Sequence, residues 1–504
     1  MSLRLYNTLS RQVDTFKPLQ AGKVSLYTCG PTVYNYAHIG NFRTFLFEDL
    51  LRRWLEGSGY DVFHVMNITD VDDKTINGAS AAGVPLRRYV QHYIDAFHED
   101  RHYLRIKDAS VYPRATDFIP AMIRLVEALL DKGVAYRGED GSVYFAIRRF
   151  PAYGRLSRLD SRELKAGASE RVASDEYTKE DVRDFAIWKA ARLEDEKVEA
   201  VWDAPFGRGR PGWHLECSAM ALELIGKHLG TDVLDIHAGG VDLIFPHHED
   251  EIAQSCAVTG KDLFARYWVH GEFLNIRGEK MSKRFGNITT PRDLREDGVD
   301  AGAIRLLMFQ THYRQQLDLT DEGLAAAQEA SRRLGEFQNR LQKARSDSES
   351  PRLAGAAERL ARDVAAALND DLNAPRAVAA MFTFMNEANA ALDAGERSGP
   401  AALQAWTNAE DVLGVTSRVT VLKVKGGGDG ALSDQAELSE TPPPDPVAAE
   451  GWARDWAVRR ARHKSVRNYA EADRIRTLLG AHGFEVRDSR DGSIDVVRTA
   501  LPKA

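Results

Sequence analysis

The sequence predicts an α/β protein built around a Rossmann-type parallel sheet, and three segments near the N-terminus carry this prediction. Residues 24–28 alternate in polarity and are rich in strand formers, and after a glycine turn residues 42–55 carry apolar side chains at helical spacing. Gly57 and Gly59 then precede a second predicted strand at residues 61–68. A strand, a helix and a strand in this order indicate a right-handed βαβ crossover.

Two further segments belong to this sheet or interrupt it. Residues 234–237 form a later predicted strand whose carboxyl end reaches residues 238–242, and parallel sheets bind their ligands at that edge. Between residues 139 and 211 the pattern changes to short strands, charged turns and glycines. This change indicates an insertion between two halves of the sheet.

The remainder of the chain predicts three units of different composition. From Thr320 to about Val415 the sequence is alanine-rich and helical in pattern, which predicts a helical bundle. Residues 425–447 contain runs of three glycines and three prolines, a composition typical of a flexible linker. The small unit that follows is rich in arginine, so it offers local positive charge.

Composition limits the class of protein. A chain of 504 residues predicts about three or four domains, and a hydrophobic fraction of 43% can supply their cores. No apolar run approaches the roughly eighteen residues of a membrane helix and the N-terminal segment lacks a signal-peptide core, so we expect a cytoplasmic protein with no membrane partner. The 3 cysteines are too few for a disulfide framework, and the net charge of -7 restricts any polyanionic partner to local basic patches.

Two short motifs far apart in the chain predict a site for ATP. His38-Ile39-Gly40-Asn41 falls at the entrance of the first predicted helix, where backbone N–H groups and an imidazole can face phosphates. Lys280-Met281-Ser282-Lys283 lies between Gly278 and Gly286, and its two lysines can stabilise the charge on departing pyrophosphate. Together the motifs indicate that ATP, with Mg²⁺, activates a carboxylate.

Four residues could form a metal site if the predicted sheet brings them together. Cys29 closes the first strand, Cys217 opens a predicted helix, and His247 and Glu251 are four residues apart on one helix face. Two thiols, an imidazole and a carboxylate are ligands that Zn²⁺ accepts. Each cysteine considered alone is more often a small buried hydrophobe than a ligand, so only the combination predicts zinc.

Two neighbouring residues are alternatives to this set. His248 competes with His247, and because adjacent helical residues point about 100° apart, at most one of the two faces the site. Periodicity does not choose between them. Cys256 lies five residues after Glu251, on a different helix face, and is expected to pack rather than to bind metal.

Six motifs together resemble the cysteinyl-tRNA synthetases, a family of class I aminoacyl-tRNA synthetases, over nearly the whole chain. They are Cys29-Gly30-Pro31-Thr32-Val33-Tyr34, His38-Ile39-Gly40-Asn41, Asn67-Ile68-Thr69-Asp70-Val71-Asp72-Asp73-Lys74, Gly212-Trp213-His214-Leu215-Glu216-Cys217-Ser218-Ala219-Met220, Phe245-Pro246-His247-His248-Glu249 and Lys280-Met281-Ser282-Lys283. The implied fold is a Rossmann-type catalytic domain with an insertion, followed by an α-helical bundle and a small mixed α/β C-terminal domain.

The resemblance also implies a role for each motif residue. It implies one zinc ion per chain, held by Cys29, Cys217, His247 and Glu251, which selects His247 over His248. It implies catalysis by His38, Lys280 and Lys283, and ATP binding by these three with Gly40, Asn41, Gly239 and Asp242. Thr69, Trp213 and His237 are implied to line the amino-acid pocket.

Contacts with tRNA are predicted at two places. Arg314 lies beyond the lysine motif, where the family packs its stem-contact region. Trp452, Trp456 and Arg459 offer the stacking and charge that suit a splayed anticodon. The alternative for the last three is a solvated basic helix with two packing tryptophans.

The implied domain boundaries follow from these positions. Residues 1–138 and 212–262 form the catalytic domain, 139–211 the insertion, 263–319 the stem-contact region, 320–417 the bundle, 418–448 the linker and 449–504 the anticodon-binding domain. Departures from the family pattern are Ala238 in place of a glycine, Asn41 in place of a histidine and Arg284 in place of a serine.

The implied activity is that of a cysteine–tRNA ligase. It activates L-cysteine with ATP to cysteinyl-adenylate and pyrophosphate, and then transfers cysteine to the 3′ end of tRNA(Cys); the family's usual state is a monomer. One alternative is a related ligase that joins cysteine to a small amine acceptor, but that family lacks the C-terminal extension. Another is a catalytically silent RNA-binding relative, but such relatives usually lose the signature lysines, which this sequence keeps.

Overall fold

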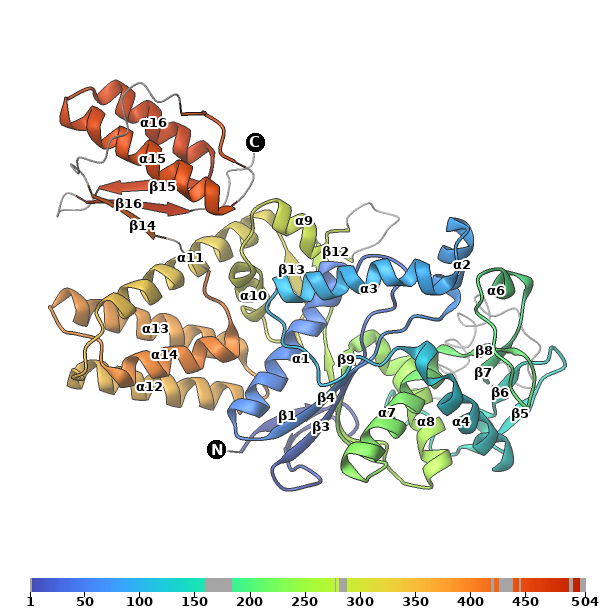
Figure 1. Ribbon diagram of the computed structural model, residues 1–504. Helices are drawn as coiled ribbons and strands as arrows, with labels where there is room; N and C mark the ends of the chain where they lie inside the picture. The colour runs from blue at the N-terminus through green and yellow to red at the C-terminus, as the bar shows by residue number, and fades with distance from the viewer. Residues whose placement is uncertain are drawn as a thin grey trace.

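The computed structural model describes residues 2–158, 184–276, 278–280, 288–417, 421–425, 438–443, 446–488 and 493–498 (Figure 1). Across these residues the central sheet has 4 parallel strands in the order β10-β9-β3-β4. They are β3 (Lys23–Thr28), β4 (Asp61–Met66), β9 (Leu234–Gly240) and β10 (Ala265–Gly271). Helix α1 (Ile39–Gly57) joins β3 to β4, which confirms the predicted βαβ unit.

Helices cover both faces of this sheet. In Figure 1, α1 lies on one side of the sheet, whereas α7 (Trp213–Leu229), α8 (Glu249–Thr259) and α4 (Ile119–Asp131) lie together on the other. Every residue of β9 and all but the first residue of β3 are buried. Strands buried on both faces are typical of parallel sheets, because the crossover helices exclude water from both sides.

Helix α1 is longer at both ends than the predicted residues 42–55. It begins at Ile39 because His38 and Asn41 cap its first turn, and it ends where Gly59 takes a φ of 90°. Phe42, Leu46 and other apolar residues at helical spacing are buried along its inner face.

The insertion is an antiparallel sheet in the order β5-β6-β7-β8. Its strands are β5 (Ala135–Arg137), β6 (Val143–Phe145), β7 (Phe185–Ala190) and β8 (Gly209–Pro211), and α6 (Leu193–Lys197) lies between the last two. The sheet thus begins shortly before the predicted residue 139. Lys189 and Arg210 reach from it to Asp73 at the start of α2 (Asp73–Ala82).

A second small sheet and two short helices follow the catalytic sheet. The sheet has the order β12-β11-β13, with β11 (Leu274–Ile276), β12 (Glu279–Lys280) and β13 (Leu317–Leu319). Helices α9 (Pro291–Glu296) and α10 (Ala301–Phe309) lie between β12 and β13 in the chain. Residues 281–287, which include Lys283 and Arg284, lie outside the described part of the chain.

The predicted bundle contains α11 (Asp321–Lys343), α12 (Pro351–Leu368), α13 (Ala374–Asp393) and α14 (Pro400–Leu413). The bundle shares one hydrophobic core with the catalytic domain. The last domain has its own core and combines α15 (Pro446–Ser465) and α16 (Tyr469–Ala481) with a sheet in the order β14-β16-β15. The strands of that sheet are β14 (Val421–Lys425), β15 (Phe484–Asp488) and β16 (Ser493–Arg498).

Strand β14 corrects the predicted linker. Residues 421–425 pair with β16 along their whole length, so this part of the segment 418–448 belongs to the sheet of the last domain. Residues 421–425 alternate apolar residues with lysines from Leu422 onward, which is a strand pattern. The linker was predicted from the many glycines and prolines that follow this short segment. Residues 426–437 lie outside the described part of the chain.

The remaining elements complete the fold. They are the hairpin β1 (Arg4–Asn7) and β2 (Gln12–Thr15), helix α3 (Leu86–Tyr103), and the short helical turns η1 (Ala115–Phe118), η2 (Ile147–Arg149), η3 (Val241–Leu243) and η4 (Ile244–His248). A search of the described residues finds no helix with the length and apolarity needed to cross a membrane.

A buried ion pair joins α1 to the helices behind it. Asp49 lies 2.8 Å from the Arg305 guanidinium, and both side chains are at most 1% exposed. Arg305 also donates to the backbone carbonyl of Leu413 at the end of α14. Burial raises the pKa of Asp49, but Arg305 and Arg53 outweigh this effect and hold it below its ordinary value.

Replacing Asp49 with Ala should lower the melting temperature strongly, because Arg305 is left charged and buried without a partner, which costs about 3–5 kcal/mol. Since the folded-state pKa of Asp49 is lowered, its contribution is present above the ordinary aspartate pKa and is lost as the pH falls through the folded value. Differential scanning calorimetry at several pH values measures both effects. Glu387→Ala, which breaks the exposed pair with Arg359, is the matched control and should cost at most about 1 kcal/mol; equal losses for the two variants would contradict the prediction.

Candidate active site

A cleft opens at the carboxyl ends of β3 and β9. The backbone N–H of Cys29, just after β3, donates to the carbonyl of Ala238 in β9 at 3.2 Å, so the two strand ends are held together. The cleft has a volume of about 260 Å³. Its lining includes the predicted residues Cys29, His38, Asn41, Thr69, Trp213, Cys217, Asp242 and His247.

The predicted metal ligands converge at one end of this cleft. The donor atoms of Cys29, Cys217, His247 and Glu251 all lie within 4.8 Å of one another, and all four side chains are buried. Zinc bonds of about 2.0–2.3 Å place two ligands of one ion about 3.3–3.8 Å apart. Four donors drawn from a strand end, two helices and the turn between β9 and α8 therefore surround a space that fits one ion.

A second group shares two members with the first. Cys29, Glu251, His237 and His248 also place their donor atoms within 4.8 Å. However, His237 and His248 are 0% exposed and do not line the cleft, whereas His247 does. The structure thus favours His247 as the histidine that faces a bound ligand, a choice that periodicity left open.

The place of His237 differs from the predicted one. Instead of lining the amino-acid pocket, it lies behind the cluster, with its Nε2 2.9 Å from the Glu251 carboxylate and its ring stacked on Trp268. Side chains along a strand point alternately to the two faces of the sheet. The His237 side chain therefore points to one face of the sheet and not toward the open end of the cleft. His237 positions Glu251 rather than contacting the contents of the cleft.

The charges of the cluster suit a cation. Burial opposes ionisation of Cys217, but the Cys29 hydrogen bond and nearby His247 lower its pKa to about 6. Burial likewise opposes ionisation of Glu251, and His237 and His247 lower its pKa to about 2. Burial disfavours charge on His247, but Glu251 and Cys217 raise its pKa to about 10. A buried thiolate and carboxylate that hold a proton on an imidazole are a donor set that can exchange this proton for a metal ion.

A supporting shell orients His247. Its Nδ1 lies 3.1 Å from Nδ1 of His214, and Nε2 of His214 lies 3.4 Å from the Asp250 carboxylate. The ring of Trp213 stacks on His247 with centroids 4.2 Å apart. Such partners fix the ring orientation of a metal-binding histidine, and Trp213 connects the cluster to the open cleft.

The cap of α1 builds another side of the cleft, where phosphates are predicted to bind. The backbone N–H of Asn41 donates to Nδ1 of His38 at 3.2 Å, and the backbone N–H of His38 donates to the Asn41 side-chain oxygen at 3.1 Å. Because Nδ1 accepts, the proton of the neutral imidazole sits on Nε2 and can be donated to a phosphate. Burial lowers the pKa of His38, which favours this neutral form.

Glycines allow backbone to approach closely at two points around the cleft. A Cβ at Gly240 would lie 2.5 Å from the Asp242 carboxylate, and one at Gly30 would lie 1.8 Å from the Asn67 carbonyl. That Gly30 permits this close approach was not predicted, although Gly30 lies in the first of the six motifs. The Thr69 hydroxyl accepts from the Asn67 side chain at 3.1 Å and borders the same part of the cleft.

The described residues that flank the lysine motif connect to β11 on one side and to the start of α1 on the other. The backbone of Lys280 pairs with Asn275 in the β11–β12 ladder, and Thr289, beyond the motif, accepts from the backbone N–H of Ile39 at 2.8 Å. The chain that follows the lysine motif therefore contacts the first residue of α1 at Thr289. The predicted residue Lys283 lies outside the described part of the chain.

The predicted tRNA contacts are placed differently from expectation. Arg314 forms an ion pair with Asp371 at 2.6 Å and lies over the Tyr6 ring, so it braces the N-terminal hairpin. Trp452 and Trp456 are only 7% and 2% exposed and pack in the core of the last domain. Their burial corrects the stacking role and matches the alternative of two packing tryptophans, because their apolar rings supply much of a small core.

An exposed turn on the last domain was missed. Val466 and Tyr469, which flank the turn between α15 and α16, are 68% and 58% exposed. Arg467 lies between them with a φ of 59°. Tyr469 thus has the exposed ring beside cations that was predicted for the tryptophans. The charges near each aromatic residue in the sequence did not indicate which ring stays outside the core.

Comparison with known proteins identifies the family. The model of the class I tRNA synthetase (C) catalytic domain matches residues 15–329, and the DALR domain model matches residues 363–416. The chain is 45% identical over 495 residues to the cysteine–tRNA ligase of Protochlamydia amoebophila (strain UWE25), covering 97% of each chain. It is also 45% identical to that of Chlamydia pneumoniae, again covering 97% of each. The chain belongs to the class I cysteinyl-tRNA synthetases.

Solved structures support the fold of this synthetase. Methionyl-tRNA synthetase of Mycobacterium tuberculosis bound by methionyl-adenylate superposes with a TM-score of 0.56 at 16% identity, over 79% of this chain and 89% of that one. The LeuRS of Agrobacterium radiobacter K84, in a ternary complex with tRNA and LeuAMS, gives 0.56 at 13% identity, over 80% and 84%. At these identities the likeness concerns the class I synthetase fold.

The cap predicts how substitutions at Asn41 affect this synthetase. Asn41→Ala removes the acceptor for the His38 N–H, a hydrogen bond worth about 0.5–1.5 kcal/mol. If the whole of this loss is felt in the placement of the His38 imidazole, the activation rate falls by at most about tenfold. Asn41→His should change the rate by less than about tenfold while adding a group that titrates near pH 6.5, which asparagine lacks. Pyrophosphate exchange measured from pH 5.5 to 8.5 tests both variants, and a loss of several powers of ten for Asn41→His would refute this role.

Proposed function

We propose that this synthetase activates L-cysteine with ATP and transfers it to the 3′ end of tRNA(Cys). The observation that carries the proposal is the junction of two sites in one cleft. A thiolate-rich metal cluster at Cys29 and Cys217 shares this cleft with the phosphate-facing cap of His38 and Asn41. Family membership and cysteine–tRNA ligases of similar length support the same activity.

The cluster is compatible with zinc, and we propose that Cys29, Cys217, His247 and Glu251 hold one ion per chain. When bound, zinc supplies a soft Lewis acid that favours a substrate thiolate over a hydroxyl. The surrounding residues keep the donors in place: Trp213 stacks on His247, and His237 holds Glu251. Recognition through one specific contact can discriminate by about 10⁴–10⁵, so cysteine can be separated from serine without a second site.

Activation follows from the geometry of the cleft. The cysteine carboxylate attacks the α-phosphorus of ATP in line, an O–P bond to the carboxylate forms, and the bond to pyrophosphate breaks. Nε2–H of His38, Lys280 and Lys283 stabilise the negative charge on the departing pyrophosphate, for which Mg²⁺ is the usual counter-ion. No protein nucleophile is required, because positioning of the two substrates supplies the catalysis.

Other groups near the cleft would hold the nucleotide and the amino acid. Asp242 lines the cleft and provides an acceptor. Gly40, in the first turn of α1, and Gly239, near the end of β9, would offer backbone N–H groups to the ATP. Thr69 and Trp213 border the space beside the metal cluster and would contact the amino acid.

Transfer requires that a tRNA span the molecule. A hydroxyl of the terminal adenosine attacks the adenylate carbonyl, an ester forms and AMP leaves. Arg459, which lies over the Trp456 ring, and the exposed turn with Tyr469 provide charge and stacking for bases far from the cleft. Arg314, being paired with Asp371, would act in tRNA binding by supporting the surface near the N-terminal hairpin.

We place the protein in the cytoplasm as a monomer.

Cysteine-dependent exchange of pyrophosphate into ATP, followed by charging of tRNA(Cys), tests the proposed function. Exchange should be supported by cysteine at least about 10⁴-fold better than by serine, and charging should follow. Exchange without charging would indicate a ligase for a small amine acceptor, which the relatives covering the whole chain do not favour. Absence of exchange would indicate a catalytically silent relative.

The metal site predicts a difference between two buried cysteines. Cys217→Ser should weaken zinc binding at least about 100-fold, because a soft thiolate in the cluster is replaced by a hydroxyl. Cys256→Ser is the matched control, because Cys256 is also buried. Within the described residues, the Arg155 guanidinium is the hydrogen-bond partner of its thiol. Zinc affinity measured by competition with a chelator gives the readout, and an affinity of Cys217→Ser equal to that of the wild type would exclude Cys217 as a ligand.

A further inference from the structure

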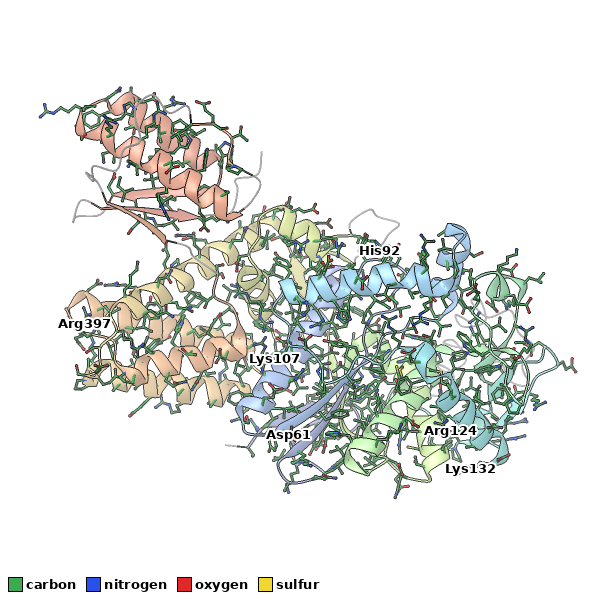
Figure 2. All side chains as sticks on the ribbon, in the orientation of Figure 1. Asp61, His92, Lys107, Arg124, Lys132 and Arg397 are labelled. Carbon is green, nitrogen blue, oxygen red and sulfur yellow. The ribbon has the colours of Figure 1, made fainter. Side chains whose placement is uncertain are left out.

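One side of the cleft carries aromatic rings that activation does not use. Tyr34 and Tyr36 belong to the loop between β3 and α1 and line the mouth of the cleft. Tyr89, His92 and Tyr93 lie on α3 and continue the same surface outside the cleft, as they are not part of its lining. Figure 2 labels His92 on this helix. We call these five residues the aromatic ledge.

Hydrogen bonds and ring contacts hold the ledge together. The Tyr36 hydroxyl lies 2.6 Å from Nε2 of His92, and the Tyr89 hydroxyl donates to the Tyr34 carbonyl at 2.9 Å. Ring centroids of Tyr36 and Tyr93 are 5.3 Å apart, as are those of Tyr89 and Tyr93. The loop of the catalytic sheet is therefore bound to α3 through the rings themselves, while Tyr34, Tyr36, Tyr89 and Tyr93 are half-buried and His92 is exposed.

Two cations flank the ledge. The ammonium of Lys74 lies 5.2 Å from the Tyr34 ring centroid, and the guanidinium of Arg292 lies 4.4 Å from that of Tyr36. Arg292 is anchored by Asp100 at 3.2 Å. Lys74 lines the cleft and is exposed, and the described part of the chain contains no ion pair to it. One cation thus braces the rings, and the other remains available to a ligand.

The position of Lys74 is fixed by its neighbours. Asp72 caps α2 by accepting from the Thr75 backbone N–H at 2.8 Å. Asp73 forms ion pairs with Lys189, at 2.7 Å, and with Arg210 of the insertion. Both carboxylates next to Lys74 are therefore engaged, and its side chain projects from a fixed helix start over Tyr34.

We propose that the aromatic ledge with Lys74 holds the single-stranded 3′ end of the RNA substrate as it enters the cleft. Bases stack on aromatic side chains regardless of sequence, and phosphodiesters need nearby cations. The ledge begins in the cleft lining at Tyr34 and Tyr36 and continues beyond it along α3, which favours a ligand that extends out of the cleft. This inference rests on the proposed transfer to tRNA.

Truncated tRNA provides a direct test. The affinities of intact tRNA(Cys) and of tRNA(Cys) lacking its four 3′-terminal unpaired nucleotides are measured for the wild type and for the double variant Tyr36→Leu, Lys74→Ala. The wild type should lose about tenfold or more in affinity when the end is removed, as expected for loss of at least one stacked base. The double variant should bind intact tRNA as weakly as the wild type binds truncated tRNA, and should lose no more than about twofold on truncation.

Kinetics separate the ledge from the rest of the site. Single-turnover transfer from preformed cysteinyl-adenylate should slow about tenfold or more in the double variant, and Lys74→Arg should restore most of the loss due to Lys74→Ala. Lys132→Ala removes an exposed cation at the opposite edge of the molecule in Figure 2 and should change neither affinity nor transfer.

Three outcomes would overturn the inference. An equal loss on truncation in the wild type and the double variant would show that the 3′ end binds elsewhere. A rise in the KM for ATP during pyrophosphate exchange that matches the loss in transfer would assign the ledge to the nucleotide. If Lys74→Arg failed to restore transfer, the positive charge at this position would have no role. Absence of exchange in the wild type would instead contradict the proposed function itself.

Discussion

The parallel pairing of β3 with β9 is the constraint on which the active site depends. The register sets Thr28 opposite Ala238, and the next residue, Cys29, still bonds to the Ala238 carbonyl. Strand β3 ends here and its chain turns toward the α1 cap, whereas β9 stays paired with β10 as far as Gly240, before the turn that precedes α8. Because backbone hydrogen bonds end here, the loops diverge and open a space into which side chains from both segments point.

Within this space the candidate metal ligands and the histidines around them form two layers. His247 and Cys217 face the cleft, while His237 and His248 lie behind, and Glu251 contacts both layers. Burial keeps the pKa of His248 well below its ordinary value, so His248 contributes a neutral imidazole to the rear layer. A carboxylate held on both sides remains anionic in a buried site, where an unpaired charge would be costly.

Helix α1 carries the geometry of the cleft to the rest of the molecule. Its first residue follows the His38 cap, and its middle is tied to α10 through the Asp49–Arg305 pair; Arg305 in turn donates to the Leu413 carbonyl at the end of α14 in the bundle. The bundle and the catalytic sheet share one core, whereas the last domain has its own core and contacts α11 through the Arg487–Glu336 pair at 2.6 Å. The position of the α1 cap is therefore coupled to the bundle through packed side chains.

The sequence by itself determined the βαβ unit, because strand and helix periodicities are local, and the family motifs singled out Cys29, Cys217, His247 and Glu251. Tertiary structure decided what periodicity left open: His247 faces the cleft, His237 lies behind it, Trp452 and Trp456 enter a core, and β14 pairs within the predicted linker. It also built the ledge, whose rings come from a loop and α3. These features depend on contacts between residues far apart in the chain, and local patterns carry no information about which partner such a residue meets.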